Sequence, residues 1–532
     1  MTPGPLGVAL ACLAGAGELR SAQTPRLGTI DFPTSGAPAA QVPFVRGVLL
    51  LHSFEYQDAL QAFREAQRID SGFALAYWGE ALAYTHPIWN EQDQNAARAA
   101  LQRLGPTREA RRAKAPTPRE KAYLDAVEAL YGAGSKTQRD TAYALAMERL
   151  VARFGADREA KVFYALSLLG LSQGVRDTAT YLRAAAIVEP VFRDNPNHPG
   201  AAHVLIHCYD DPIHAPLGLA AARAYSKIAP DAAHAQHMTT HIFLALGMWD
   251  EVVSQNEIAS GQNRAAWGPH HYTAWLGYGY LQQGRYEDAL RHLDLMHQNV
   301  NQARRGRAVL AQMRADYVVN TERWDCPCLR WSVDLAGVRA RDAALDLFIA
   351  GLSALKRGDR AGAEHGLADL VALNRNRAPP DPGQERDQVP DILQKELQAL
   401  LRQAGGVGGA GGAGGAGGVP ANAVALMQQA TALEDAMPVE FGPPADVKPA
   451  HELLGEMLLQ AGRAGEAQVE FARALAHAPK RALSLLGLGR AAAAAGDRNT
   501  AARAYRELRE MWHRADPSLP GLAEAARFLA TR

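Results

Sequence analysis

The chain has 532 residues, long enough for several domains or for one elongated array of repeats. Its 56 basic and 56 acidic residues cancel, so we do not expect nucleic acid or an anionic membrane surface as the main partner. The four cysteines, Cys12, Cys208, Cys326 and Cys328, are too few for a disulfide framework in a chain of this size.

The N-terminal stretch "PLGVALACLAGAG" is apolar and has the length of a signal-peptide core. Ala14 and Ala16 stand in the arrangement of a cleavage site, and the stretch is too short to span a membrane. We therefore predict a signal peptide over residues 1–24 and a periplasmic or secreted protein. The alternative is a disordered N-terminus, because no Lys or Arg precedes Arg20.

A first helical hairpin is predicted in "FVRGVLLLHSFEYQDALQAFREAQRID", and a second copy begins at "ALAYWGEALAYTHPIW". His52 and His86 are 34 residues apart, at matching ends of the first helix of each hairpin. We expect these two histidines to hydrogen-bond the loops beside them, with a second ligand site as the alternative. Further copies are readable in "AKVFYALSLLGLSQG", "HHYTAWLGYGYLQQGRYEDAL" and "ALDLFIAGLSALKRGDRAGAEHGL".

Two irregular segments interrupt the repeats. "CPC" at 326–328 offers two thiols, too few for a zinc site, so a disulfide or two inert thiols are expected. The glycine-rich tract, assigned to 405–420, has the composition of a flexible linker. We predict that it is an expanded loop between two helices of one hairpin, rather than a hinge. It separates an N-terminal and central array (25–404) from C-terminal hairpins (421–532).

The repeat is clearest near the C-terminus. The residue pairs that recur at a spacing of 34 are Gly455 and Gly489, Gly462 and Gly496, Ala467 and Ala501, and Phe471 and Tyr505. With Leu454, Leu458, Ala474 and Pro479 they match the tetratricopeptide repeat pattern. Small residues let two helices approach closely, and bulky residues fill the space beside them. The predicted fold is an all-α tetratricopeptide solenoid of roughly ten to twelve hairpins.

The chain resembles bacterial tetratricopeptide repeat proteins that carry "GVLLLHSFEY" in the first hairpin and "HIFLALGMW" near the middle. The resemblance covers essentially everything after residue 25. It implies a right-handed superhelix whose first helices line a concave groove, a surface that commonly binds peptides or proteins. It implies no known reaction.

Histidines are concentrated in one part of the chain: seven of 17 lie between residues 198 and 241. The second, fifth and ninth positions of the first helix of each hairpin are expected to face the groove. Counting from Gly247 and stepping by one hairpin places the following residues on that face: His203, His207, His234, His237, His241, His271 and Tyr278. Six imidazoles should therefore share one face of three adjacent hairpins.

This spacing favours metal binding. Residues at i and i+4 on a helix are neighbours, so His203 with His207 and His237 with His241 can converge on one ion. Asp210 and Asp211 can complete the ligand set or orient the imidazoles. Zinc, copper or iron suits such donors, whereas the zinc-protease motif is absent because no Glu stands between the histidines. A metal-free binding site or a structural polar network is the alternative.

Glu452 and Glu456 take groove positions in their own hairpin, where we expect a solvated acidic wall or a source of a carboxylate. No phosphate-binding glycine loop and no G-x-S-x-G elbow occurs in the sequence. Two functions follow: a scaffold that binds a peptide, protein or small molecule in a histidine-lined groove, or a metal-dependent enzyme of hydrolase or oxidase type. Neither nucleic acid nor an integral membrane span is expected.

Overall fold

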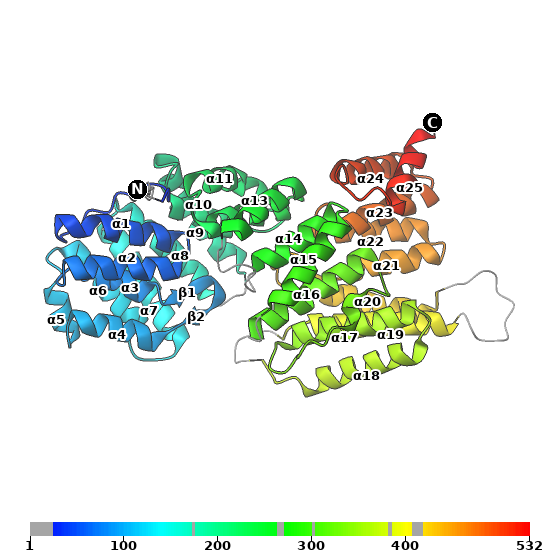
Figure 1. The fold of residues 1–532 in the computed structure, drawn as a ribbon, viewed down its shortest axis with the longest axis horizontal. Helices are drawn as coiled ribbons and strands as arrows, with labels where there is room; N and C mark the ends of the chain where they lie inside the picture. The colour runs from blue at the N-terminus through cyan, green and yellow to red at the C-terminus, as the bar shows by residue number, and fades with distance from the viewer. Residues whose placement is uncertain are drawn as a thin grey trace, which may run out of the picture.

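The computed structural model describes residues 25–172, 176–262, 271–300, 304–380, 386–406 and 419–531. The predicted signal peptide, residues 1–24, lies outside the described residues, as does most of the glycine-rich tract. In the described part, consecutive helices pack in pairs, which confirms the predicted all-α solenoid of helical hairpins (Figure 1).

The eleven pairs among the described residues are α1 (Pro38–His52) and α2 (Tyr56–Ile69), α3 (Ala74–Leu82) and α4 (Gln94–Leu104), α6 (Pro118–Leu130) and α7 (Lys136–Arg153), α8 (Arg158–Leu171) and α9 (Thr178–Asp194), α10 (Pro199–Cys208) and α11 (Ala215–Ile228), α12 (Ala233–Ala245) and α13 (Trp249–Gln262), α14 (His271–Gln282) and α15 (Tyr286–Asn299), α17 (Ala340–Lys356) and α18 (Arg360–Asn376), α19 (Val389–Gly406) and α20 (Ala421–Ala436), α21 (Ala450–Gln460) and α22 (Ala464–His477), and α23 (Ala482–Ala494) and α24 (Arg498–Met511). Outside these pairs lie α5 (Arg108–Ala113), α16 (Arg304–Thr321), α25 (Pro520–Ala530), the 3-10 helices η1 (Pro87–Trp89) and η2 (Pro327–Arg330), and the short antiparallel strands β1 (Thr85–His86) and β2 (Glu91–Gln92).

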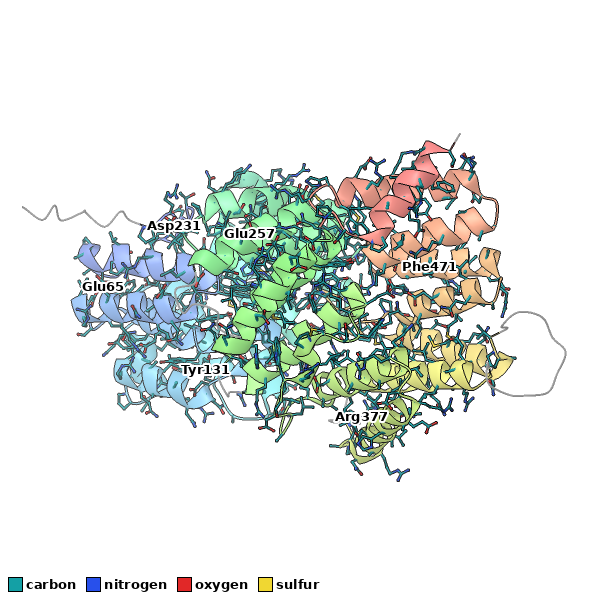
Figure 2. All side chains as sticks on the ribbon, turned by 45° about the vertical axis from the view of Figure 1, so that its right-hand side comes forward. Glu65, Tyr131, Asp231, Glu257, Arg377 and Phe471 are labelled. Atoms are coloured by element: carbon teal, nitrogen blue, oxygen red, sulfur yellow. A yellow bond between two sulfur atoms is a disulfide. The ribbon has the colours of Figure 1, made fainter. Side chains whose placement is uncertain are left out.

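Glycine and aromatic residues pack in the same way at both ends of the array. A Cβ atom added to Gly79 would lie 2.3 Å from the ring of Phe63, and one added to Gly487 would lie 2.2 Å from the ring of Phe471. Phe471 belongs to the C-terminal helices, as Figure 2 shows. Only a residue without a side chain fits where the ring of one helix meets the backbone of the next, which explains the repeated glycine.

The array folds so that its central helices are contacted from both ends of the chain. Helix α1 packs against α10. The indole N–H of Trp249 donates to the carbonyl of Lys480 at 3.0 Å, and that of Trp512 donates to the carbonyl of Gln282 at 3.0 Å. In Figure 1 the N-terminal helices (blue) and the C-terminal helices (orange to red) flank the green segment α10–α14.

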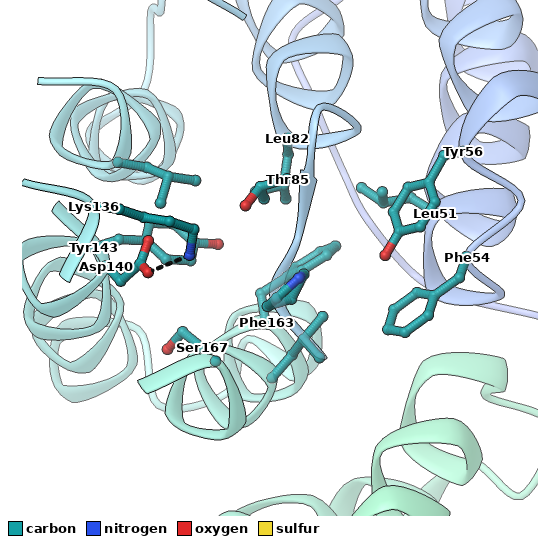
Figure 3. Close-up of a pocket in the computed structure, with 14 residues that line it drawn as sticks. Leu51, Phe54, Tyr56, Leu82, Thr85, Lys136, Asp140, Tyr143, Phe163 and Ser167 are labelled. Carbon is teal, nitrogen blue, oxygen red and sulfur yellow. Dashed lines mark hydrogen bonds and ion pairs between the residues drawn. The ribbon is translucent and has the colours of Figure 1, made fainter. Parts of the chain in front are cut away.

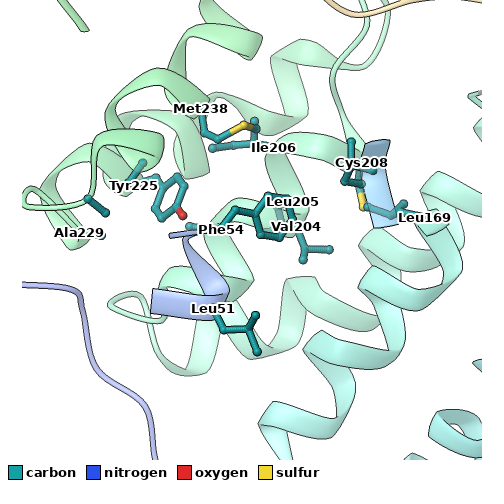
Figure 4. Close-up of a cluster of buried hydrophobic side chains, with 14 of the residues drawn as sticks. Leu51, Phe54, Leu169, Val204, Leu205, Ile206, Cys208, Tyr225, Ala229 and Met238 are labelled. Carbon is teal, nitrogen blue, oxygen red and sulfur yellow. The ribbon is translucent and has the colours of Figure 1, made fainter. Parts of the chain in front are cut away.

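This closure buries two helices on all sides. Every residue of α10 is buried, and so are twelve of the thirteen residues of α12. Val204, Leu205 and Ile206 of α10 pack into the apolar core together with Tyr225 and Met238 (Figure 4). A helix covered all round belongs to a core rather than to a surface, so its polar residues need partners inside the protein.

The two irregular segments are partly described. Cys326 and Cys328 form a disulfide, one of the two states expected for "CPC". Helices α19 and α20 pack against each other on either side of the glycine-rich tract. Among the described residues, no helix combines the length and the apolar character needed to cross a bilayer.

Candidate metal centre

The structure brings together six histidines from three adjacent hairpins. They form two groups, in each of which one ligand nitrogen per residue lies within 4.8 Å of the others. We call His237, His241 and His271 the first trio, and His203, His207 and His234 the second trio. The first trio comes from α12 and α14, and the second from α10 and α12.

The histidines are buried, which differs from the open groove expected from the repeat register. His203, His207, His234, His237 and His241 are each at most 4% exposed, and only His271 is partly exposed. Aromatic rings from the first hairpin, from α14 and from the segment between α20 and α21 cover them. The ring centroid of Phe54 lies 4.2 Å from that of His203. The ring centroids of Trp275 and Phe441 lie 4.3 Å and 5.3 Å from that of His241.

In the first trio, hydrogen bonds fix which ring nitrogen carries the proton. The Nδ1 of His241 lies 2.5 Å from a carboxylate oxygen of Asp210, which can only accept. The Nδ1 of His237 lies 2.7 Å from the amide oxygen of Asn256, whose NH2 group donates to the carbonyl of Val252 at 3.0 Å. In their neutral forms both imidazoles therefore carry their proton on Nδ1 and an unshared electron pair on Nε2.

These two Nε2 atoms face each other at 3.2 Å. Two neutral rings with this tautomer place two acceptors in contact with no proton between them, and that arrangement is repulsive. Two nitrogens that bind one tetrahedral ion at about 2.0–2.1 Å are held about 3.3 Å apart. The spacing of His237 and His241 thus matches that of two ligands on a shared metal ion.

In the second trio, the Nδ1 of His203 donates to the carbonyl of His52 at 2.6 Å, which leaves its Nε2 as an acceptor. This Nε2 lies 3.2 Å from the Nε2 of His234, whose Nδ1 is 2.9 Å from the hydroxyl of Tyr272. The Nε2 of His207 is buried and has no hydrogen-bond partner among the described residues.

Burial sets the charge of these side chains. It lowers the pKa of His203 to about 3 and holds the pKa values of His207, His234 and His237 well below the usual value of 6.5, with the neighbouring histidines adding to the effect on the last three. Neutral imidazole is the form that binds a metal. His203, His207, His234 and His237 are therefore held in their ligand form at physiological pH.

The turn between α1 and α2 covers the second trio. Phe54 adopts a φ of 54°, a left-handed conformation that is unusual for a bulky residue. Its ring packs 5.3 Å from His234 and 6.0 Å from His207, in addition to His203. The next residue, Glu55, accepts a hydrogen bond from the backbone N–H of His234 at 3.0 Å. This strained turn joins the first hairpin to the histidines.

A third group, His52, Glu159 and His198, also has the spacing of a metal site. The Nδ1 of His198 accepts from the backbone N–H of Ala201, so its Nε2 carries the proton and lies 2.9 Å from Glu159. The Nε2 of His52 lies 2.6 Å from the other carboxylate oxygen. Burial opposes ionisation of Glu159, but His198 and His52 lower its pKa to about 2. His52 hydrogen-bonds one oxygen of Glu159, whereas the Nε2 of His198 and the other oxygen approach each other without hydrogen-bond geometry and have no other hydrogen-bond partner among the described residues.

The other predicted site residues lie apart from the two trios or act on them indirectly. Asp210 orients His241. Asp211 is directed instead toward Arg176 at 2.6 Å and the Nδ1 of His214 at 2.8 Å, so it does not join the histidines. His86 is partly exposed and stacks on Tyr56, with 4.0 Å between ring centroids.

Glu452 and Glu456 do not form a solvated acidic wall opposite the histidines. Glu452 is fully buried and accepts from Arg481 at 2.8 Å and from Lys448 at 3.0 Å, and Lys448 also lies 2.5 Å from Glu456. The hydroxyl of Tyr278 accepts from Arg481 at 3.1 Å. These residues form a buried ion-pair network that joins α14 to α21 and α23.

A small apolar pocket of about 40 Å³ adjoins the second trio. Phe54 lines it (Figure 3), and the same ring contacts those of His203 and His207. At its polar end Lys136 donates to Asp140 at 2.6 Å. The buried hydroxyl of Tyr56 lines the pocket and has no hydrogen-bond partner among the described residues.

Residues that sequence reasoning missed are Asn256, Phe54 and Trp275. Asn256 lies 19 positions after His237, in the next helix, where no motif marks it. Phe54 belongs to the conspicuous "HSFEY" stretch, but its contact with His203 spans 149 residues of sequence and depends on how tightly the superhelix closes. Trp275 sits one turn after His271 and was detectable as an aromatic neighbour on the same helix.

Comparison with known proteins adds little to this site. No model of a known protein family matches the chain, and no curated protein sequence does. Solved structures similar to the fold include a human IFIT1 dimer with m7Gppp-AAAA (14% identity, TM-score 0.36, 90% of this chain and 91% of that chain), yeast Tom70 (11%, 0.28, 92% and 95%) and the P58(IPK) TPR domain (12%, 0.21, 93% and 100%). These are tetratricopeptide repeat proteins. Likenesses this distant carry no argument about function or partner.

Proposed function

We propose that the protein binds a transition-metal ion through His237, His241 and His271, within a helical scaffold that holds these imidazoles in place. The proposal is based on the 3.2 Å contact between the Nε2 atoms of His237 and His241. The Nδ1 atoms of these rings are engaged by Asn256 and Asp210. A cation between the two nitrogens replaces the repulsion with two coordinate bonds. Zinc, copper and iron suit neutral imidazole ligands.

Burial of the cluster favours a metal ion over a peptide as its ligand. A peptide in a groove needs side chains that reach solvent, whereas His237 is fully buried and His241 is 2% exposed. Asp210 and Asn256 supply the hydrogen bonds from outside the ligand set that metal-binding histidines generally require. A partner protein would have to use another surface of the solenoid.

A metal-dependent enzyme of hydrolase or oxidase type is a second candidate function. Three protein ligands leave one position of a tetrahedral ion open to a substrate or water. His271 is the partly exposed member of the first trio, which gives that position a side toward solvent.

We also propose that the mature protein is exported, on the strength of the apolar stretch and the cleavage pair within residues 1–24. Sequencing the N-terminus of the native protein from separated cell fractions tests this. A processed chain outside the cytoplasm supports export, and an unprocessed chain confined to the cytoplasm contradicts it.

Metal content measured on the full chain, purified without a histidine tag after growth with added metals, tests the proposed function. We expect at least one equivalent of metal in the wild type and in His365→Ala, whose side chain is 80% exposed on α18. We expect His241→Ala to lose at least one equivalent. A wild type without metal, or a His241→Ala variant with unchanged content, would contradict the proposal.

A further inference from the structure

We infer that the centre is dinuclear, and that His203, His207 and His234 bind a second metal ion beside the first. This inference rests on the proposed function, which concerns the first trio only. The two trios share no residue, and each offers three imidazole nitrogens within 4.8 Å of one another. One chain therefore provides two complete sets of three ligands.

Among the residues of the second trio, His207 gives the strongest indication that a metal ion binds there. Its side chain is 4% exposed, and its Nε2 has no hydrogen-bond partner among the described residues. A buried polar atom without a partner costs about 1–3 kcal/mol. Its neighbours include the rings of Phe54, His203 and His241, the carboxylate of Asp210 and the guanidinium of Arg176. A metal ion at this position would accept the electron pair of the imidazole nitrogen and so give the buried atom a partner.

His203 and His234 complete the set. Because His203 donates its Nδ1 proton to the carbonyl of His52, its Nε2 is an electron-pair donor aimed at the Nε2 of His234, 3.2 Å away. A proton on the Nε2 of His234 would satisfy this pair without a metal, so the pair alone would not carry the inference. The Nε2 of His207 has no hydrogen-bond partner that could satisfy it in the same way. It is this third nitrogen that indicates a metal ion bound by all three histidines.

The two ions would be neighbours. His207 and His241 belong to different trios, but their ring centroids are 5.7 Å apart, and with Asp210 they also bring ligand atoms within 4.8 Å of one another. Asp210 is engaged by the Nδ1 of His241, which leaves the Nε2 of His241 for the first ion. Both ligand sets are then entirely imidazole. Among divalent first-row metals, copper binds nitrogen ligands most strongly, so Cu²⁺ is the metal used to load both positions.

Copper loading of the full-length protein tests the inference. Protein saturated with Cu²⁺ and freed of excess metal by gel filtration is assayed for copper per chain by mass spectrometry. We expect two copper ions in the wild type and in His365→Gln, and one in His207→Gln and in His234→Gln. Circular dichroism checks that each variant folds. The number of copper ions bound by the wild type tests the inference even where a variant fails to fold.

Electron paramagnetic resonance of the same samples reports proximity. We expect the Cu²⁺ signal of the wild type to be broadened by the neighbouring spin, and that of His207→Gln to be the sharp signal of an isolated ion. A wild-type chain with one copper that His207→Gln retains would overturn the second ion and leave the proposed function intact. A wild type without copper or any other metal would overturn both, and two copper ions with identical sharp signals in both proteins would overturn the dinuclear arrangement.

Discussion

The Nε2 atoms of His237 and His241 lie 3.2 Å apart, while Asn256 and Asp210 hold the protons of the same two rings on Nδ1. The relationship depends on the tautomers, which the surrounding hydrogen bonds impose. A contrasting case lies nearby: the Nε2 atoms of His52 and His198 lie 2.6 Å and 2.9 Å from a carboxylate, that of Glu159, so a negative charge rather than a second lone pair faces each ring. Comparing the two groups separates a candidate metal site from a structural network.

Replacing Asp210 by Asn should weaken metal binding by about 10- to 100-fold, as is typical when a partner of a ligating histidine is changed. The amide can donate to the Nδ1 of His241, which moves the ring proton to Nε2 and blocks coordination. Competition with a chelator of known affinity measures the effect. Asp211→Asn is the matched control, because Asp211 contacts Arg176 and His214 instead. Equal affinities in the two variants would contradict the assigned tautomer.

His198→Ala should lower stability and leave the metal content unchanged. The substitution removes the N–H that faces Glu159 and leaves a buried carboxylate with one fewer donor, at a cost of about 1–3 kcal/mol. Thermal unfolding and metal analysis of the same preparation check both parts. Loss of one metal equivalent with unchanged thermal stability would instead identify His52, Glu159 and His198 as a metal site.

Glu452→Ala should destabilise the fold by about 3–5 kcal/mol, because it leaves the buried guanidinium of Arg481 without its carboxylate. Burial opposes ionisation of Glu452, but Arg481 and Lys448 bring its pKa down to about 2, so the carboxylate is charged at neutral pH. The double variant Glu452→Met/Arg481→Met should recover part of the loss, since it removes both charges. Denaturant unfolding measures both variants. A single variant as stable as the wild type would argue for a solvated acidic wall.

Asp316→Asn should stabilise the protein at alkaline pH but hardly at acid pH. Burial raises the pKa of Asp316 from 3.8 to about 7, so the folded state keeps a proton that the unfolded chain releases. The stability that Asp316 contributes through this proton is fully present below pH 3.8 and is lost as the pH rises to about 7. At about 1.4 kcal/mol per pH unit, this span corresponds to about 4 kcal/mol.

Unfolding of the wild type and of Asp316→Asn at pH 4 and pH 8 measures this difference. An advantage of the variant that is the same at both pH values would show that Asp316 is not protonated in the folded state at neutral pH.

The solenoid was predictable from sequence because its packing is local. Gly487 and Phe471 lie in adjacent helices, and the same kind of pair recurs as Gly79 with Phe63. The repeat register also predicted six histidines on one face of three adjacent hairpins, and in the structure they lie on α10, α12 and α14. The register describes one hairpin at a time, however. The curvature of the whole array decides which distant residues cover the face that carries the histidines.

Closure of the superhelix is the part that could not be predicted. It brings Phe54 onto His203 and Phe441 toward His241, across 149 and 200 residues of sequence. It also places Arg481 beside Glu452 and Tyr278, turning an expected acidic wall into a buried network. These contacts depend on small rotations summed over many hairpins, for which no single motif gives a signal.

Anomalous diffraction from crystals of the metal-loaded protein, recorded at the absorption edge of the bound metal, tests the central claim most directly. We predict a peak within about 2.0–2.1 Å of the Nε2 atoms of both His237 and His241, with the Nδ1 atoms still held by Asn256 and Asp210. Crystals of metal-saturated protein with no anomalous peak at this position, and with one of the two rings turned to hydrogen-bond the other, would contradict the account.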